Sequence, residues 1–377
     1  MIIIRADGNA GIGAGHLMRC LTIADALGCE AAGCGITDSS CGLDGCREPG
    51  RRDAASKIPE IIFACADETS ALLAAQHGYD TWVLDTDYRD MESELPKWEE
   101  RFSSDNPSKN ILLVDSYFVT IPYLAQLRRY GILVLLDDMA KQAYPVDAVI
   151  NYNAFAQQET YGRLYNGTDT RCYVGGRFIP IRPMFTEAGC LVKDKAENML
   201  ITTGGGDSRN IAAAVLRAVY QAGMHYHIVT GRYNPHFQEL KEMERSYPGV
   251  EIHYDVSDMA GLMRRCDLAV TAGGTTVYEL AALGVPFICF SYAENQEALA
   301  EYIGKQGIAG YGGAFHKDPG RTLAGIAGQA ALLEEDCELR RVYHCREKNM
   351  VDGLGAQRLA NILVEYHNSL QEPADLG

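Results

Sequence analysis

A glycine-rich loop that ends at a histidine is the first place where residue types and spacing indicate chemistry. The loop Gly11–Gly15 follows the apolar run Ile2–Ala6 and is followed directly by His16. Small residues let a ligand approach the backbone closely, and a histidine can act as a general base near neutral pH. We therefore predict substrate contacts at Gly13 and Gly15 and a catalytic role for His16. A dinucleotide fingerprint, G-x-G-x-x-G, would need glycine at the position of His16, so the pattern disfavours dinucleotide binding.

A second glycine turn, within Thr271–Pro286, leads into a predicted helix. Here an apolar run ends at two glycines, and two threonines follow them. The free N–H groups at such a helix start bind phosphate without a net positive charge on the protein. The predicted diphosphate cradle comprises Gly273, Gly274, Thr275 and Thr276. Glu279, one turn further on, can accept ribose hydroxyls. The alternative is an ordinary strand–turn–helix without a ligand.

Amide side chains follow the next apolar run. The segment Ser291–Gln296 leaves the predicted strand Phe287–Phe290 and carries Asn295 and Gln296. An amide offers both donors and an acceptor, so it can orient a sugar or a water molecule. A polar loop without a ligand is the alternative interpretation.

Two acidic pairs and a group of cysteines raise the question of a metal. Asp85-Thr86-Asp87 has the D-x-D form, and Asp137-Asp138 follows an apolar run, but aspartates after strands commonly cap turns or helices. Four cysteines lie close together but form no C-x-x-C pair, which does not fit common zinc patterns. They are Cys29, Cys34, Cys41 and Cys46. We interpret them as reduced thiols in a glycine-rich loop of a cytoplasmic enzyme. Two of them lie in a polar insertion, Cys41–Lys57, whose role the sequence leaves open. We predict no metal and no cofactor.

Alternating strands and helices must position these groups. Helical patterns such as His16–Leu27 and Ile121–Tyr130 lie between short apolar runs, which indicates parallel βαβ units. The pattern restarts at Met199–Thr202, which runs into Gly204-Gly205-Gly206. We therefore predict an α/β chain with two Rossmann-like, doubly wound domains. The predicted strands lie near Ile2–Ala6, Trp82–Leu84, Ile111–Val114, Ile132–Leu136, Ala148–Asn151, Met199–Thr202, His227–Thr230, Glu251–Tyr254, Leu268–Thr271 and Phe287–Phe290.

Length and composition limit the class of protein. The 377 residues are enough for two domains, and 47% hydrophobic residues with 38 glycines give a globular profile. No apolar run reaches the roughly 20 residues that span a bilayer, and the N-terminus lacks the basic start of a secretory signal. We therefore expect a cytoplasmic protein without membrane insertion. The formal net charge of −16 disfavours a nucleic-acid partner. A monomer is the simplest expectation, although the sequence does not fix the oligomeric state.

The ordered set of motifs resembles the UDP-sugar hydrolases of pseudaminic-acid biosynthesis, a family that includes spore-coat polysaccharide proteins. The resemblance covers most of the chain apart from the insertion and the C-terminal tail. The matching segments are Arg5–Asp7 with Gly13–Leu21, Val114–Tyr117, Leu136–Asp138, Asp147–Ala154, Gly204–Asp207, Gly273–Pro286 and Ala293–Gln296. The C-terminal half is also similar to the nucleotide domain of the lipid II glycosyltransferase. In that comparison Ser257-Asp258-Met259 matches a loop that contacts uracil, and Glu279 matches a ribose-binding glutamate.

The resemblance implies a glycosyltransferase-B architecture with an interdomain cleft. Residues 1–177 would form the sugar-binding and catalytic domain, 178–355 the UDP-binding domain, and 356–377 a C-terminal helix and tail. The implied reaction is hydrolysis of UDP-2,4-diacetamido-2,4,6-trideoxy-beta-L-altropyranose to UDP and free sugar, by attack of water at the anomeric carbon. The sequence itself does not fix the sugar stereochemistry or the N-acyl pattern. A glycosyltransferase on the same fold and a non-catalytic nucleotide-sugar binding protein are the alternatives.

The resemblance also carries residue roles over to this chain. It implies that His16, Asn295 and Tyr117 are catalytic. The implied substrate contacts are Arg5, Asp7, Gly13, Gly15, Gly205, Met259, Gly273, Gly274, Thr275, Thr276, Glu279 and Gln296. The chain departs from the family pattern at Ser116 and Phe118, on either side of Tyr117, and at Gly206, where the family often has serine.

Overall fold

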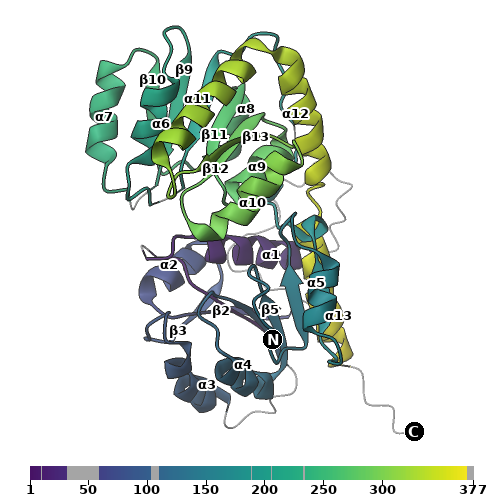
Figure 1. The fold of residues 1–377 in the computed structure, drawn as a ribbon. Helices are drawn as coiled ribbons and strands as arrows, with labels where there is room; N and C mark the ends of the chain where they lie inside the picture. The colour runs from purple at the N-terminus through teal and green to yellow at the C-terminus, as the bar shows by residue number, and fades with distance from the viewer. Residues whose placement is uncertain are drawn as a thin grey trace. The chain divides into compact units, whose positions relative to one another are not determined.

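The chain folds into two compact units. The structure is a computed structural model, and it describes residues 1–9, 11–31, 59–102, 110–187, 189–204, 206–231 and 234–371. The first unit comprises Met1–Pro180 and Leu354–Gly377, and the second comprises Ile181–Gly353 (Figure 1). The C-terminal helix α13 (Gly355–Ser369) therefore belongs to the first unit, where it packs along α1 (Gly15–Ala31). The cysteine-containing insertion Cys41–Lys57 lies outside the described residues.

A seven-stranded sheet forms the centre of the first unit. Its strands are all parallel and run in the order β3-β2-β1-β4-β5-β6-β7. Their bounds are β1 (Ile2–Ala6), β2 (Ile61–Cys65), β3 (Asp80–Val83), β4 (Ile111–Asp115), β5 (Ile132–Leu136), β6 (Ala148–Asn151) and β7 (Arg171–Val174). Since β1 lies between β2 and β4, the connections leave it in both directions, which is the doubly wound arrangement.

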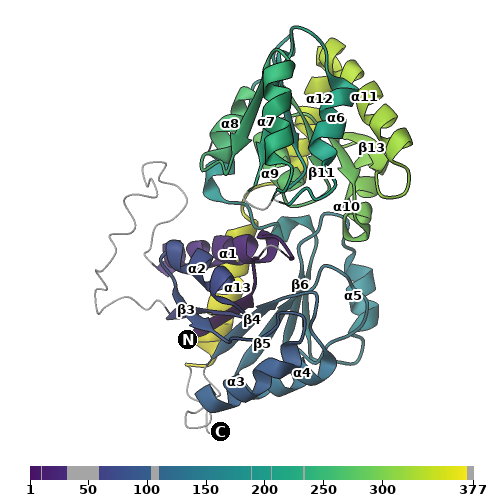
Figure 2. The same ribbon diagram turned by 90° about the vertical axis from the view of Figure 1, so that its left-hand side faces the viewer.

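Helices cover both faces of this sheet (Figure 2). One face carries α1, α2 (Glu68–Gln76) and α13, and the other carries α3 (Leu95–Phe102), α4 (Ile121–Leu127) and α5 (Gln158–Leu164). Capping residues fix where the helices begin: the Asp67 carboxylate accepts the Ser70 N–H at 2.7 Å, and the Thr120 hydroxyl accepts the Tyr123 N–H at 3.2 Å. Trp98 and Tyr123 are fully buried against the second face.

The second unit repeats this plan with six parallel strands. Their order is β10-β9-β8-β11-β12-β13. The strands are β8 (Asn198–Thr202), β9 (His225–Thr230), β10 (Val250–Tyr254), β11 (Leu268–Ala272), β12 (Phe287–Ser291) and β13 (Gly310–Ala314). The main core lies between the sheet and α6 (Ile211–Val219), α7 (Phe237–Ser246) and α11 (Pro319–Glu335). The remaining helices are α8 (Met259–Arg265), α9 (Thr276–Leu283), α10 (Glu294–Lys305) and α12 (Cys337–Met350).

Two parallel, doubly wound α/β sheets confirm the predicted fold class. The sequence analysis missed β2, β7 and β13, of which β13 has a clear physical cause. That strand reads Gly-Tyr-Gly-Gly-Ala, which strand propensity disfavours. Its glycines are needed because α11 packs closely on it, and a Cβ at Gly312 would collide with Ile326.

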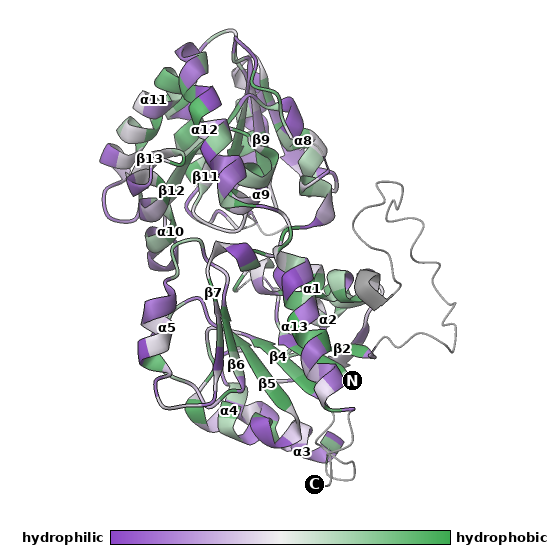
Figure 3. Cartoon of the chain, turned by 90° about the vertical axis from the view of Figure 1, so that its right-hand side faces the viewer, coloured by the Kyte–Doolittle hydropathy of each residue, from purple (hydrophilic) through white to green (hydrophobic). Residues whose placement is uncertain are grey.

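The hydropathy of the chain follows this layering. Figure 3 shows central strands such as β4 and β5 coloured as hydrophobic, whereas helices such as α12 and α13 carry both hydrophobic and hydrophilic residues. Such mixed helices bury one face against a sheet. Within the described residues, no helix combines the length and the apolar character needed to cross a membrane.

Candidate functional site

Several of the predicted site residues follow the strands at which each sheet reverses its strand order. In doubly wound sheets, ligands bind beyond the carboxyl ends of the strands at this switch point. In the first unit the switch point lies between β1 and β4, which lead to His16 and Tyr117 respectively. In the second unit it lies between β8 and β11, which lead to Gly204 and Gly273. Each unit therefore has one candidate site.

His16 forms a close pair with Asp115 in the first unit. The His16 Nδ1 atom lies 2.6 Å from Asp115 Oδ1, and both side chains are buried. Burial would raise the pKa of Asp115, but Arg19 and His16 outweigh this effect and hold that pKa below its usual range. The carboxylate is therefore ionised and can only accept, which favours a ring proton on Nδ1, whereas the donor Arg19 Nη2, 2.9 Å from the same nitrogen, disfavours it. With the proton on Nδ1, the lone pair of His16 lies on Nε2, as a general base requires.

Arg19 holds the Asp115 carboxylate in place. It lies one turn after His16 in α1, and its Nε and Nη2 atoms are each 2.5 Å from an oxygen of Asp115. Its Nη1 atom is 2.9 Å from Asp138 Oδ2 and also donates to the Tyr152 hydroxyl. Sequence reasoning did not single out Arg19 or Asp115 as site residues. For Arg19 the sequence does contain a signal, because a basic residue three positions after His16 lies on the same face of the predicted helix.

Tyr117 lies beside His16, so the structure brings these two predicted residues together. Their ring centroids are 4.4 Å apart in an edge-to-face arrangement, and the Tyr117 hydroxyl is 3.2 Å from Asp138 Oδ2. Tyr117 is 44% exposed, whereas His16 is 6% exposed. Tyr117 is thus accessible to a ligand that would approach the imidazole.

The glycine loop before His16 is open at Gly13 and Gly15, which suits a ligand-binding loop, whereas Gly11 packs against the Tyr88 hydroxyl. Gly13 has a φ of +73°, and a Cβ at Gly13 or Gly15 would meet no atom within 4 Å. Asn9 shapes the loop, because its side-chain oxygen accepts the Gly11 N–H at 2.9 Å and its carbonyl accepts the Gly13 N–H at 2.8 Å.

Arg5 and Asp7, both predicted to bind substrate, lie inside the first unit. The exposed fractions of their side chains are 1% and 2%, and Arg5 Nη1 is 2.5 Å from Asp7 Oδ2. Arg5 Nε also donates to Glu94 at 2.9 Å, and Asp7 Oδ1 accepts the Ala66 N–H at 2.7 Å. These contacts make both side chains supports of the β1 end. Their contact with substrate remains a prediction.

The acidic pairs make hydrogen bonds typical of turns. Asp137 Oδ1 accepts the N–H groups of Met139 and Ala140 at 3.0 and 3.2 Å. Asp87 Oδ1 accepts the Arg89 N–H at 2.9 Å. Asp138 is instead part of the Arg19 network. These contacts support a turn-capping role for Asp87 and Asp137.

In the second unit, the glycine turn before α9 leaves open space at the start of the helix. A Cβ at Gly273 would lie 2.9 Å from the Gln296 carbonyl oxygen, so close packing on α10 requires glycine there. A Cβ at Gly274 would meet no atom within 4 Å. Thr275 and Thr276 begin α9, where the first N–H groups have no acceptor within the helix. This combination suits an anion.

Buried hydroxyls gather at the carboxyl edge of the second sheet. Among the described residues, Thr203, Thr230 and Ser291 have buried hydroxyls without a protein partner. They follow or end β8, β9 and β12 respectively. Unpaired buried hydroxyls are uncommon, so three of them at one sheet edge indicate that a polar group, ordered water or a ligand, is bound there.

Glu279 forms an ion pair with Arg182. Glu279 Oε1 lies 2.7 Å from Arg182 Nη2. Burial raises the pKa of Glu279, and Arg182 partly offsets that effect. Arg182 lies 97 positions before Glu279 in the sequence, so no local sequence pattern predicts that the two side chains pair. The contact of Glu279 with ribose remains a prediction.

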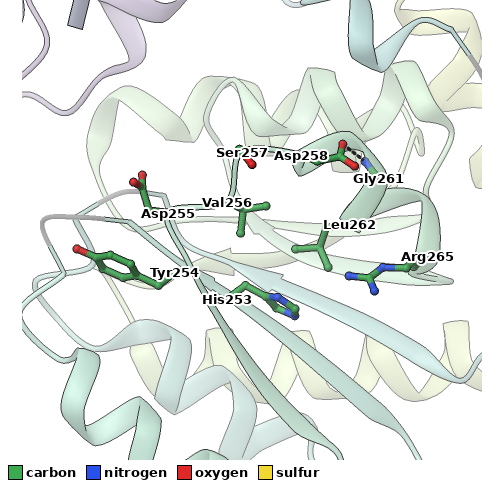
Figure 4. A pocket seen from close by; sticks show the side chains of 9 residues that line it. All are labelled: His253, Tyr254, Asp255, Val256, Ser257, Asp258, Gly261, Leu262 and Arg265. Atoms are coloured by element: carbon green, nitrogen blue, oxygen red, sulfur yellow. Dashed lines mark hydrogen bonds between the residues drawn. The ribbon is translucent and has the colours of Figure 1, made fainter. Parts of the chain in front are cut away.

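The other predicted contacts of the second unit are spread over several loops. Met259 begins α8, next to a hollow of about 590 Å³ that Ser257 and Asp258 help to line (Figure 4). Asn295 is exposed in the first turn of α10, and Gln296 Oε1 accepts the Tyr292 N–H at 3.0 Å. Gly205 lies outside the described residues.

Comparisons with known proteins give distant relatives. A family model described as a protein of unknown function, DUF354, matches residues 211–308. The spore coat polysaccharide biosynthesis protein SpsG of Bacillus subtilis is 30% identical over 227 residues, which cover 59% of this chain and 65% of SpsG. The UDP-2,4-diacetamido-2,4,6-trideoxy-beta-L-altropyranose hydrolase of Campylobacter jejuni is 21% identical over 308 residues, covering 81% of this chain and 97% of that enzyme.

Solved structures agree on the fold. The glycosyltransferase of kitacinnamycin matches with a TM-score of 0.63 and 15% identity, covering 97% of this chain and 98% of the other. At this identity the likeness establishes the fold alone. The chain therefore has a glycosyltransferase-B fold and is a distant homologue of SpsG and of the UDP-2,4-diacetamido-2,4,6-trideoxy-beta-L-altropyranose hydrolases.

Proposed function

We propose that the chain is a UDP-sugar hydrolase, and that its substrate is UDP-2,4-diacetamido-2,4,6-trideoxy-beta-L-altropyranose or a close relative. The observation that carries the proposal is the buried His16–Asp115 pair, with 2.6 Å between Nδ1 and Oδ1, beside an open glycine loop. The substrate class comes from the homologous Campylobacter jejuni enzyme.

In this proposal, His16 Nε2 takes a proton from water as the water oxygen attacks the anomeric carbon. Asp115 stabilises the resulting imidazolium, and Arg19 keeps the carboxylate in position. The bond from the anomeric carbon to the UDP oxygen breaks, and the departing diphosphate is held by the N–H groups of Thr275 and Thr276. Attack from the face opposite UDP inverts the anomeric centre.

The remaining assignments place further predicted residues in this reaction. Tyr117 and Asn295 orient the sugar or the water, and Gln296 contacts the substrate from the first turn of α10. Glu279 and Met259 serve the ribose and the uracil. No step in this scheme uses a metal, because a proton acceptor and cationless anion binding meet its requirements.

The experiment is to incubate the purified protein with a panel of UDP-amino-sugars and to measure UDP and free sugar. We expect both products at equal rates with water as the sole acceptor. If turnover stays negligible until a lipid or sugar acceptor is added, the chain is a glycosyltransferase instead. If UDP-sugars bind but no acceptor supports turnover, it is a binding protein.

A further inference from the structure

Two histidines and a glutamate converge on the edge of the second sheet. His227 lies on β9, and Glu251 and His253 lie on the neighbouring edge strand β10. Glu251 is paired with His227 in the strand register. The ligand atoms of all three lie within 4.8 Å of one another. None of the three takes part in the proposed hydrolysis.

The spacing of the three ligand atoms fits a tetrahedral metal. His227 Nδ1 is 3.0 Å from His253 Nε2, and Glu251 Oε2 is 3.4 and 3.6 Å from these two nitrogens. In a tetrahedral zinc site with bonds of about 2.0–2.1 Å, ligand atoms lie roughly 3.3–3.4 Å apart. The three observed separations bracket this value. The atoms therefore need little movement to occupy three corners around one ion.

The surroundings prepare both imidazoles for this role. Tyr226 and Ile252 point into the main core, so strand alternation places the histidines on the opposite face of the sheet. His227 Nε2 is 3.3 Å from Asn198 Oδ1, and donation to this oxygen directs the His227 Nδ1 lone pair toward the group. Metal-binding histidines typically make such a second hydrogen bond. Burial lowers the pKa of both histidines, which favours the neutral form that binds metal.

Nearby charges both oppose and favour a cation. Figure 4 shows the His253 ring and the Arg265 side chain pointing toward one another across the hollow. Arg265 disfavours a cation, whereas Glu251 supplies a negative charge. The positive charge of Lys241 also lowers the pKa of His253, but Lys241 Nζ forms an ion pair with Glu244 Oε2 at 2.9 Å. A neutral ring pair with one carboxylate suits a zinc-like ion better than magnesium or calcium, which prefer oxygen ligands.

We propose that His227, Glu251 and His253 form a binding site for a zinc-like divalent transition metal, with water completing a four-coordinate shell. The ion would join β9 to the edge strand β10 and so stabilise the folded second unit. Sequence reasoning missed this group because the two histidines are 26 positions apart on different strands and match no local motif.

The test uses the full-length protein, freed of metal by dialysis against a chelator. Isothermal titration calorimetry with Zn²⁺ should show one ion bound per chain, and Zn²⁺ should raise the melting temperature. Co²⁺ should give the visible absorption of a four-coordinate site without a thiolate charge-transfer band. A thiolate band would assign the metal to cysteines and overturn the proposal, as would the absence of binding.

Variants locate the ion. His227→Ala and His253→Gln should each weaken Zn²⁺ binding by more than about 100-fold, and Asn198→Ala should weaken it by about 10–100-fold. Arg265→Gln should strengthen binding, because it removes a positive charge. The control His236→Asn changes a histidine outside the group and should bind as the wild type does. If His227→Ala does not fold, His253→Gln and Arg265→Gln decide the matter. Unchanged affinity in these two variants would contradict the site.

Discussion

Replacing Asp115 by asparagine tests how far the catalytic role of His16 depends on its buried partner. The side chain keeps its shape but loses its charge. Asp115 is 1% exposed. Its Oδ1 atom is hydrogen-bonded to both His16 Nδ1 at 2.6 Å and Arg19 Nη2 at 2.5 Å. The asparagine cannot satisfy every donor around it. Its NH₂ group must face either His16 or Arg19, both of which need an acceptor. In both orientations the imidazolium loses its counter-charge.

The size of the effect follows from Coulomb's law. Opposite unit charges about 4 Å apart interact by about 4 kcal/mol at an effective dielectric constant of about 20. Loss of that stabilisation in the transition state corresponds to a fall in kcat of about 10³-fold. This lies within the range of about 10²–10⁴-fold that general-base catalysis usually contributes. UDP affinity should change little, because the predicted UDP contacts lie in the second unit.

The matched control is Asp138→Asn. Both variants remove one carboxylate from Arg19, which Asp138 contacts at 2.9 Å, but only Asp115→Asn alters the partner of His16. Steady-state assays of UDP release, with melting temperatures to confirm folding, should show Asp138→Asn within about 10-fold of wild type. The reasoning fails if Asp115→Asn is folded and no slower than Asp138→Asn.

Three further predictions concern the nucleotide, the reaction and the fold. UDP should raise the melting temperature, GDP and CDP should do so less, and Glu279→Ala should reduce the UDP effect; equal stabilisation by all three nucleotides would rule out a uracil site. Turnover should persist after treatment with a chelator, so restoration of lost activity by Mg²⁺ or Mn²⁺ would contradict the proposed mechanism. Burial raises the pKa of Glu347 well above its usual value, so its carboxyl ionises in the unfolded chain at a lower pH than in the fold, and the fold loses stability as pH rises from the unfolded to the folded pKa. Denaturant unfolding curves at several pH values should show Glu347→Gln gaining stability over wild type by at most about 1.4 kcal/mol per pH unit in that window, and no change with pH would contradict the raised pKa of the buried carboxyl.

The strand pattern predicted both sheets, since alternating apolar runs and helices are a local signal. The sequence did not predict β13, because glycines disfavour a strand and are explained here only by the close packing of α11, which is a tertiary contact. The same limit applies to the sites. His16 and the Gly273–Thr276 turn follow strands and are visible in the sequence, whereas Arg182 reaches Glu279 from a distant segment. Arg5 and Asp7 match a family motif, yet burial and mutual pairing, which the sequence does not show, make them supports of the strand end.

Hydrolysis in ¹⁸O-labelled water, followed by mass spectrometry of both products, tests the central claim most directly. His16 is proposed to activate water for attack at the anomeric carbon, so the label should appear in the free sugar and be absent from UDP. His16→Asn should slow incorporation by about 10²–10⁴-fold while UDP affinity stays close to that of the wild type. Label in UDP would show attack at phosphorus, and near-normal turnover of a folded His16→Asn variant would remove His16 from the chemistry. Either result would contradict the account.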